Sequence, residues 1–280
     1  MKKIVVPCDF SDPSIEAFKF AVKLAKKSEG KVIVVHVIDL PIFYESTFGM
    51  QPYTFDPSFI KELEKYAKEK FESLKSTYGE GHRDLLFVNP FGAVTPMLQQ
   101  EIDLQKPDIV VMGTHGVSGL KEYLVGSNTE KIVRHAHVPV VAVRTCIPIE
   151  KIKNIVFATT LDLNQTALIK KVKELQSFFS AMLHVIVINT PEDFKRDKDL
   201  QEALENYVQH YHLEHYTLNK RTDINEMEGI LSFAKEVKAD LIAMATHGRR
   251  GLFHLLTGSI AEDVVNHGTA PVWTCSLRER

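Results

Sequence analysis

Two stretches of the chain carry glycines and hydroxyl residues in an arrangement that suits phosphate binding. Residues 110–127 read VVMGTHGVSGLKEYLVGS, and residues 242–259 read IAMATHGRRGLFHLLTGS, 132 positions later. In each copy an apolar run leads into a Gly-rich turn, and nine residues further on a Gly-Ser pair opens a helix-like stretch. Small residues let backbone N–H groups approach an anion, and a helix N-terminus faces it. The spacing therefore predicts a phosphate-binding loop in each copy.

The two copies are not equivalent. Gly113 in the first copy is replaced by Ala245 in the second. The alanine adds a Cβ atom where the backbone should approach a phosphate, at a position that could need positive φ. We therefore expect the first copy to bind an anion better than the second.

The composition narrows the function classes. At 280 residues the chain has room for two domains of ordinary size, and 44% apolar with 25% charged residues is the content of a globular protein. A net charge of −2 gives no electrostatic case for binding nucleic acid or an anionic membrane, and no apolar run is long enough to span a bilayer. The apolar part of MKKIVVPCDF is too short for a secretory signal. Three cysteines without a close pair favour a reduced, cytoplasmic location.

Strand-length apolar runs alternate with stretches of helical periodicity, which predicts a parallel sheet covered by helices on both faces. A cap at Asp12 and a stop at Gly30 bound the first expected helix. The other helices of the first half are expected at 58–76, 93–105 and 126–135. The expected strands are KKIVVPCDF, KVIVVHVID, DLLFVNPFG, DIVVMG and PVVAVR.

The pattern restarts after a linker near 147–153, with strands expected at KNIVFATT, MLHVIVIN, DLIAMATHG and PVWTCS. The offset between the halves is 151 at the first two strands and 132 at the glycine loop, so the second half lacks 19 residues. We expect them to be missing from the excursion at 40–57, whose aromatic residues could form a lid or a partner surface. The predicted fold class is α/β, with two domains, 1–146 and 150–280, each an open five-stranded parallel sheet. Ligands of such sheets bind at the carboxyl ends of the strands, near the switch in strand order.

The segments PCDFSD, HVID and MGTHG, with nine residues before GSNTE, resemble the universal stress protein family in order and spacing. The resemblance covers essentially the whole chain, as two tandem domains. It implies a fold similar to Rossmann, flavodoxin-like and other adenine-nucleotide-binding folds. Some members bind ATP through G-x₂-G-x₉-G-[ST], and others lack that motif. Members commonly pair through an edge strand, so the tandem chain looks like an intrachain pseudo-dimer, with a homodimer of two chains left open.

Carried over to this sequence, the resemblance implies a complete ATP site in the first half. The glycine amides and the start of the helix at Ser127 would hold the phosphates, with Mg²⁺ accompanying them. Asp9 would accept hydrogen bonds from the ribose or base, and the backbone of Val37 would face the adenine edge. The implied nucleotide-binding residues are Pro7, Cys8, Asp9, Val37, Met112, Gly113, His115, Gly116, Gly126, Ser127, Asn128 and Thr129.

The second half departs from this pattern, because Thr160 replaces Asp9 and Ile188 stands where Val37 was. Its weaker candidate residues for an anion are Gly248, Gly258 and Ser259.

Several of these residues also have simpler interpretations. Asp9 could form a turn after its strand, and His115 could hydrogen-bond its own loop. Three histidines, at 210, 212 and 215, invite a metal hypothesis, since alternating residues of a strand share a face. No Cys or carboxylate has a telling spacing beside them, so we assign neither a metal site nor a catalytic residue.

The expected function is that of an ATP-binding, nucleotide-dependent sensor or regulator in a stress response. A slow ATP hydrolase is the first alternative. It is disfavoured because the chain has no P-loop lysine and no convincingly placed acidic residue in the phosphate loop. The second alternative is a different small ligand bound by the second domain.

Overall fold

The computed structural model describes residues 1–39, 57–114, 127–246 and 260–276. Most of the expected excursion at 40–57 and most of both glycine loops therefore lie outside the described residues. The first half contains β1 (Lys3–Pro7), α1 (Asp12–Ser28), β2 (Lys31–Val35), α2 (Pro57–Tyr78), β3 (Leu85–Val88), α3 (Val94–Gln105), β4 (Ile109–Gly113), α4 (Ser127–His135) and β5 (Val140–Val143). The second contains β6 (Asn154–Ala158), α5 (Thr166–Phe179), β7 (Met182–Asn189), α6 (Asp197–His210), β8 (Tyr216–Thr222), α7 (Glu226–Glu236), β9 (Leu241–Ala245), α8 (Ile260–His267) and β10 (Val272–Cys275).

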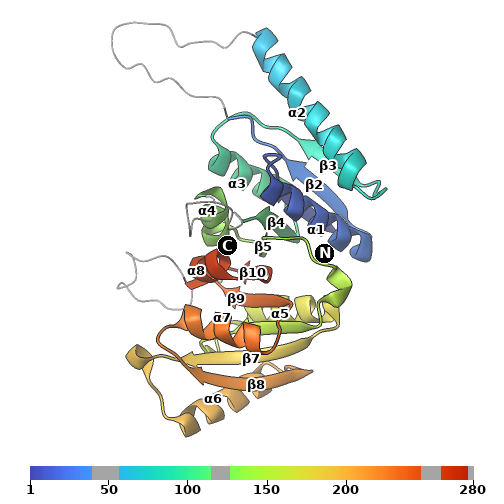
Figure 1. Ribbon diagram of the computed structural model, residues 1–280. Coiled ribbons are helices and arrows are strands. Elements are labelled where there is room, and N and C mark those ends of the chain that lie inside the picture. Colours follow the sequence, from blue (N-terminus) through green and yellow to red (C-terminus); the bar gives the residue numbers. More distant parts are fainter. Residues whose placement is uncertain (40–56, 115–126, 247–259, 277–280) are drawn as a thin grey trace, which may run out of the picture.

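The strands of both halves form one continuous sheet (Figure 1). In the described part of the chain its order is β3-β2-β1-β4-β5-β10-β9-β6-β7-β8. Neighbouring strands are parallel within each half, whereas β5 and β10 pair antiparallel, with Trp273 opposite Val141. The prediction of an α/β fold with two five-stranded parallel units is confirmed. The antiparallel seam adds that the units share a sheet in the manner of a pseudo-dimer.

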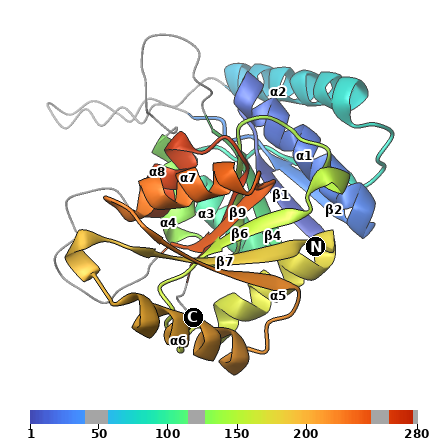
Figure 2. The ribbon, with the colours of Figure 1, turned by 60° about the horizontal axis from the view of Figure 1, so that its bottom comes forward.

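The helices divide between the two faces of this sheet because each half winds outward and then back. One face carries α1, α2, α5 and α6, and the other carries α3, α4, α7 and α8; Figure 2 shows α5 and α6 on the opposite side of the sheet from α7 and α8. On the first face, one apolar core runs across the seam from Ile4 to Trp273. On the other face there are two separate cores, one in each half, and Ala142 of β5 packs in the core of the second half. Buried side chains on both faces explain why the strands are nearly continuous apolar runs.

Helix α1 begins and ends slightly differently from the expectation. Its cap is Ser11, whose side chain makes no capping hydrogen bond, and Asp12 is the first helical residue. An acidic residue in the first turn and Lys26 and Lys27 in the last turn complement the helix dipole. The left-handed residue that ends the helix is Glu29, at φ 48°, and not Gly30.

The 19 residues missing from the second half are not all lost from the excursion. Helix α6 has 14 residues and α2 has 22, so eight of the missing residues are absent from the helix itself. The expectation that they all come from 40–57 is wrong. The apolar face of the helix fixes only where it packs, and not how many turns extend beyond the sheet.

The junction between the halves is held by polar contacts as well as by the seam. The Arg134 guanidinium donates to both carboxylate oxygens of the buried Glu262, from Nε and Nη2, each at 2.7 Å. Arg144 donates to the carbonyl of Asn266 at 2.9 Å. The linker also packs into the core, because Ile149 and Ile152 are buried. Within the described residues, no helix combines the length and apolarity that crossing a membrane requires.

Candidate functional site

The candidate site lies where the strand order reverses in the first half. The chain leaves β1 toward β2 on one side and returns to β4 on the other, so the loops after β1 and β4 diverge. Open sheets of this kind bind ligands at such a reversal, and we call this place the first-half crevice. In the second half the same reversal falls between β6 and β9. The candidate residues predicted from the sequence belong to the strand ends and loops at these two places.

Asp9 forms a turn and also keeps an exposed carboxylate. Its Oδ1 accepts from the backbone N–H of Ser11 at 3.0 Å and from the Ser11 hydroxyl at 2.5 Å. Partial burial raises the pKa of the carboxyl, but hydrogen bonds from Ser11 and Ser14 outweigh it, so the pKa of Asp9 is lowered. The crevice therefore presents an ionised carboxylate, which is a hydrogen-bond acceptor only.

Pro7 and Cys8 are buried immediately before this carboxylate. The Cys8 Sγ lies 3.4 Å from the Ser14 hydroxyl, and burial raises the pKa of the Cys8 thiol. A neutral, buried thiol is a packing group and a poor nucleophile. These two residues shape the floor beneath Asp9.

Val37 follows β2 with its backbone turned toward the crevice. The N–H groups of His36 and Ile38 donate to the carbonyls of Val88 and Pro90, each at 2.9 Å, so both point away toward β3. Successive N–H groups of an extended strand point to opposite edges, and the Val37 N–H therefore faces the β1 side. There the Cys8 carbonyl accepts from the imidazole Nδ1 of His36 at 2.8 Å.

Gly113 has a packing role that the sequence did not indicate. A Cβ built on Gly113 would lie 2.2 Å from the carbonyl oxygen of Pro13 and 2.8 Å from the backbone nitrogen of Ser14. The end of β4 thus touches the first turn of α1, and only glycine fits. The suggested need for positive φ at this position is wrong, because φ of Gly113 does not lie in the left-handed region.

Helix α4 begins at Ser127, as the sequence indicated, and its first turn is tied to the end of β4. The hydroxyl of Thr129 donates to the Gly113 carbonyl at 3.0 Å, and the Asn128 side chain accepts from Thr95 at 2.9 Å. Both side chains thereby orient the helix start, and the Thr129 contact holds it beside the end of β4. Met112 is buried in the core beneath α3 and α4, so its side chain supplies packing and no surface to a ligand.

The remaining glycine-loop residues cannot be placed from the described chain. His115, Gly116 and Gly126 of the first loop lie outside it, as do the second-half candidates Gly248, Gly258 and Ser259.

In the second half, backbone polar groups of the loop after β6 are hydrogen-bonded by a side chain of the protein itself. The Tyr211 hydroxyl accepts from the backbone N–H of Gln165 at 2.7 Å and donates to the carbonyl of Asp162 at 3.2 Å. Tyr207, fully buried beside it, makes an edge-to-face contact with the Tyr211 ring. Nothing in the sequence signals this capping, because Tyr211 lies 46 positions from Gln165.

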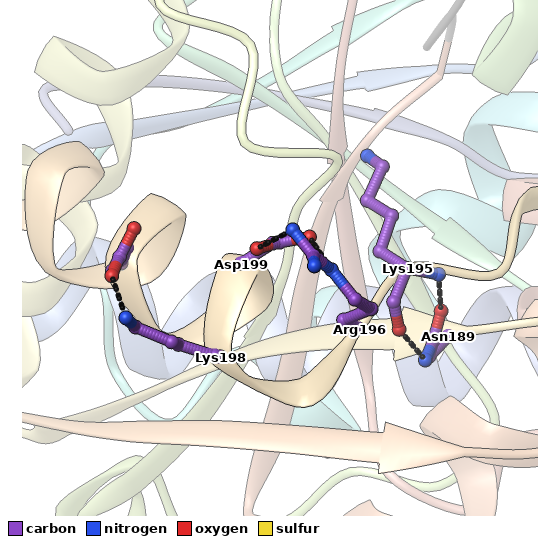
Figure 3. A network of polar contacts seen from close by, with 6 residues as sticks. Asn189, Lys195, Arg196, Lys198 and Asp199 are labelled. Atoms are coloured by element: carbon purple, nitrogen blue, oxygen red, sulfur yellow. Dashed lines mark hydrogen bonds and ion pairs between the residues drawn. The ribbon is translucent and has the colours of Figure 1, made fainter.

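The loop after β7 is likewise held by hydrogen bonds from a side chain to the backbone (Figure 3). The amide of Asn189 donates to the carbonyl of Lys195 and accepts from its backbone N–H, both at 2.9 Å. Arg196 then pairs with Asp199 in the first turn of α6. Figure 3 shows Asn189 bridging the two ends of this short loop. Residue 189 is equivalent to Ile38, where the first half instead continues into the excursion.

The histidines proposed as a metal pair do not lie on a strand. His210 is the last residue of α6, and His212 and His215 have left-handed backbone in the loop before β8. The expectation of a shared strand face is therefore wrong. Among the described residues, no three His, Cys, Asp or Glu side chains gather as a metal site requires.

Comparison with known proteins identifies a family with which both halves of the chain share sequence similarity. The model of the universal stress protein family matches residues 1–144 and 151–276. A universal stress protein of Methanocaldococcus jannaschii is 31% identical over 144 residues, which cover 51% of this chain and 82% of that protein. A putative universal stress protein of Staphylococcus aureus is 31% identical over 149 residues, covering 51% and 84%.

Solved structures agree on the fold of the whole chain. A universal stress protein from Archaeoglobus fulgidus superposes with a TM-score of 0.77 at 18% identity, covering 99% of this chain and 98% of that one. A putative universal stress protein from Pseudomonas aeruginosa gives 0.65 at 16% identity, with coverage of 99% and 93%. With both halves matched by the family model and the tandem fold shared, this chain belongs to the universal stress protein family.

Proposed function

We propose that this protein binds one ATP, with Mg²⁺, in the first-half crevice, and that occupancy of this site regulates its conformation or partners in a stress response. Asp9 would accept hydrogen bonds from the ribose or base, and the Val37 backbone would meet the adenine edge. The amides at the start of α4 would hold the phosphates, together with Gly113, Gly116 and Gly126 of the loop. Phosphate oxygens would supply most of the Mg²⁺ ligands.

The convergence of three polar elements supports this proposal. The ionised Asp9 carboxylate, the inward Val37 N–H and the amino end of α4 belong to three different segments, and all stand at the carboxyl ends of β1, β2 and β4. An acceptor, a strand-edge donor and a positive helix end match the sugar, base and phosphates of a nucleotide. Family membership is consistent with this site.

The second half supports the assignment of a single nucleotide per chain. Thr160 replaces the carboxylate, and the Tyr211 hydroxyl already accepts from the backbone N–H of Gln165, the residue that caps α5. A ligand there would have to displace internal hydrogen bonds, each worth about 1 kcal/mol net.

Titration calorimetry with ATP and Mg²⁺ on the full chain tests the proposal. We expect one site per chain. Asp9→Asn should weaken binding about tenfold, since a hydrogen bond to a charged group is worth roughly 1.5–3 kcal/mol. The asparagine oxygen can still accept from Ser11, so the turn should be kept.

Thr160→Val is the matched control at the equivalent position, and it should leave ATP affinity within about twofold. Absence of ATP binding, or equal loss in the two variants, would contradict the proposal. Phosphate release measured on the same samples separates a regulator from a hydrolase, because sustained turnover that is lost in Asp9→Asn would establish the enzyme.

A further inference from the structure

A cavity lies between the two halves, apart from the candidate site, on the face of the sheet that carries α1 and α5. It has a volume of about 890 Å³ and runs along α5. Its opposite wall is the amino edge of the first half, at Met1, Asp108 and Pro139. The N-terminus and α5 lie side by side in Figures 1 and 2. The cavity exists because β5 and β10 are antiparallel, which turns the amino ends of the first-half strands toward α5.

The floor of this cavity is apolar. Met1 and Phe178 line it with partly exposed side chains, and Ile109, Ile169, Leu175 and Trp273 lie directly beneath it, almost fully buried. Its volume is within the range of pockets that hold small organic ligands, which are mostly apolar with a few polar groups. The floor therefore suits an apolar ligand body.

The rim of the cavity is cationic. Lys2, Lys170, Lys171 and Lys173 line it, against Asp108 and Glu174. Glu174 pairs with Lys171 at 3.2 Å, and Asp108 is held in place by the backbone N–H groups of Lys2 and Lys3. Within the described residues, Lys170 and Lys173 have no ion-pair partner. One turn of α5 thus brings two uncompensated positive charges to the edge of an apolar cavity.

We propose that this cavity binds a small amphiphilic anion, with an apolar chain on the floor and a carboxylate or similar head group between the lysines. Charge complementarity selects the head group and burial of the chain supplies affinity. The inference does not depend on nucleotide binding, because Asp9 and Val37 do not line this cavity.

The chain carries its own reporter for the test. Trp273 is the single tryptophan and it lines the cavity, so its fluorescence responds to a ligand there. The probe is decanoate below its micellar concentration, titrated into the full chain and followed by tryptophan fluorescence and calorimetry. Decyltrimethylammonium has the same chain with the opposite charge, and acetate has the head group alone. We expect one decanoate per chain, with both comparison compounds binding at least about tenfold more weakly.

Charge reversal locates the head group. The double variant Lys170→Glu, Lys173→Glu should weaken decanoate at least about tenfold. Lys65→Glu, Lys68→Glu on the exposed side of α2 makes the same charge change at the same spacing and should stay within about twofold. Far-ultraviolet circular dichroism checks that both variants are folded.

Four results would overturn the proposal. They are no decanoate binding, equal binding of the cationic analogue, equal loss in the two double variants, and competition between decanoate and saturating ATP with Mg²⁺. The last result would assign decanoate to the nucleotide crevice. Failure of ATP to bind at all would leave this proposal standing and remove only the proposed nucleotide function.

Discussion

The two halves keep the same frame and differ where a ligand would bind. Phe10 and Leu161 occupy equivalent positions and both have left-handed backbone, at φ 63° and 62°, so the turn after the first strand is alike in each half. Beyond it, the first half presents the exposed Asp9 carboxylate, while the second directs the Tyr211 hydroxyl into its own loop. The duplicated frame accommodates this difference because neither the Asp9 carboxylate nor the Tyr211 hydroxyl takes part in sheet pairing.

The difference between Gly113 and its equivalent, Ala245, is related to the different lengths of helices α1 and α5. Gly113 touches the first turn of α1, whereas its equivalent, Ala245, carries a Cβ. Helices α1 and α5 end at equivalent residues, but α5 has 14 residues and α1 has 17. The turn that would meet the extra methyl group is therefore missing from α5. We infer that the glycine and the first turn of α1 depend on each other.

The largest expected effect comes from exchanging these two residues. Gly113→Ala should lower the free energy of unfolding by about 2–3 kcal/mol, because the new Cβ overlaps the Pro13 backbone and the first turn must move. Urea denaturation of the full chain measures this. Ala245→Gly should cost less than about 1 kcal/mol, the usual cost of glycine in a strand.

Equal losses in the two variants would show that Gly113 is not selected by packing. The same measurement shows whether a Gly113 variant could serve as a probe of phosphate binding. A loss of ATP affinity in a larger substitution would follow from the displaced helix as readily as from a blocked anion site.

The next largest expected effect on stability concerns the equivalent residues Glu130 and Glu262 at the junction between the halves. Glu262 is 5% exposed and accepts two hydrogen bonds from Arg134, whereas Glu130 is 42% exposed and accepts one, at 3.2 Å. Glu262→Gln should lower the free energy of unfolding by about 2 kcal/mol, because a buried charged partner is lost. Glu130→Gln should cost about 0.5 kcal/mol or less.

Urea denaturation of both variants at low and high salt checks the assignment. The effect of Glu262→Gln should persist at high salt, since a buried pair is weakly screened, and the effect of Glu130→Gln should fade. A larger loss for Glu130→Gln would reverse the roles given to the two carboxylates.

Local periodicity was enough to predict most of the elements. The expected strand MLHVIVIN coincides with β7, and the expected helix at 93–105 differs from α3 by one residue. The antiparallel seam was not predictable as such, because nothing in the apolar runs of β5 and β10 records which edge each one pairs with. The left-handed Phe10 was also unmarked, since that conformation usually signals glycine or asparagine.

At the candidate site, residue types and their spacing indicated which strand ends are important. The structure then showed which of those residues pack in the core and which carry exposed polar groups. Asp9 and Val37 follow the carboxyl ends of β1 and β2, and their contact with a nucleotide stays a prediction. Met112 and Cys8 are instead core residues, a distinction that a run of alternating apolar residues cannot make at its end. Contacts such as Pro13 with Gly113 depend on tertiary packing across a hundred positions.

A smaller expected effect is a pH dependence of stability that arises in the second half alone, at His184. His184 lies in β7 where the equivalent residue of the first half is Ile33, and burial lowers the pKa of its imidazole. The Asn154 oxygen can only accept, so Nε2 donates to it at 3.2 Å, and Nδ1 accepts from the Thr217 hydroxyl at 2.8 Å. The native state therefore prefers neutral imidazole.

With a lowered native pKa, the unfolded chain binds more protons as the pH falls below about 6.5, and stability declines toward the native pKa. His184→Gln should remove this part of the pH dependence, and the variant and wild type should converge in acid. Urea denaturation between pH 7.5 and pH 5 measures the difference. A parallel displacement of the two curves would mean that His184 acts by packing alone.

The smallest expected effect concerns Asp9, whose equivalent Thr160 does not titrate. Because the native pKa of Asp9 is lowered, its contribution to stability is complete above the ordinary carboxyl pKa and is lost as the pH falls through the native value. Asp9→Asn should therefore be slightly less stable than wild type at pH 7 and equal to it near pH 2. Unfolding measured between those limits tests this, and the gap should be small since the side chain is exposed. Adding ATP with Mg²⁺ should widen the gap at pH 7 in proportion to the affinity difference, because the nucleotide stabilises only the form that binds it. A gap that nucleotide leaves unchanged would make Asp9 a turn residue and return the two halves to equivalence at this position.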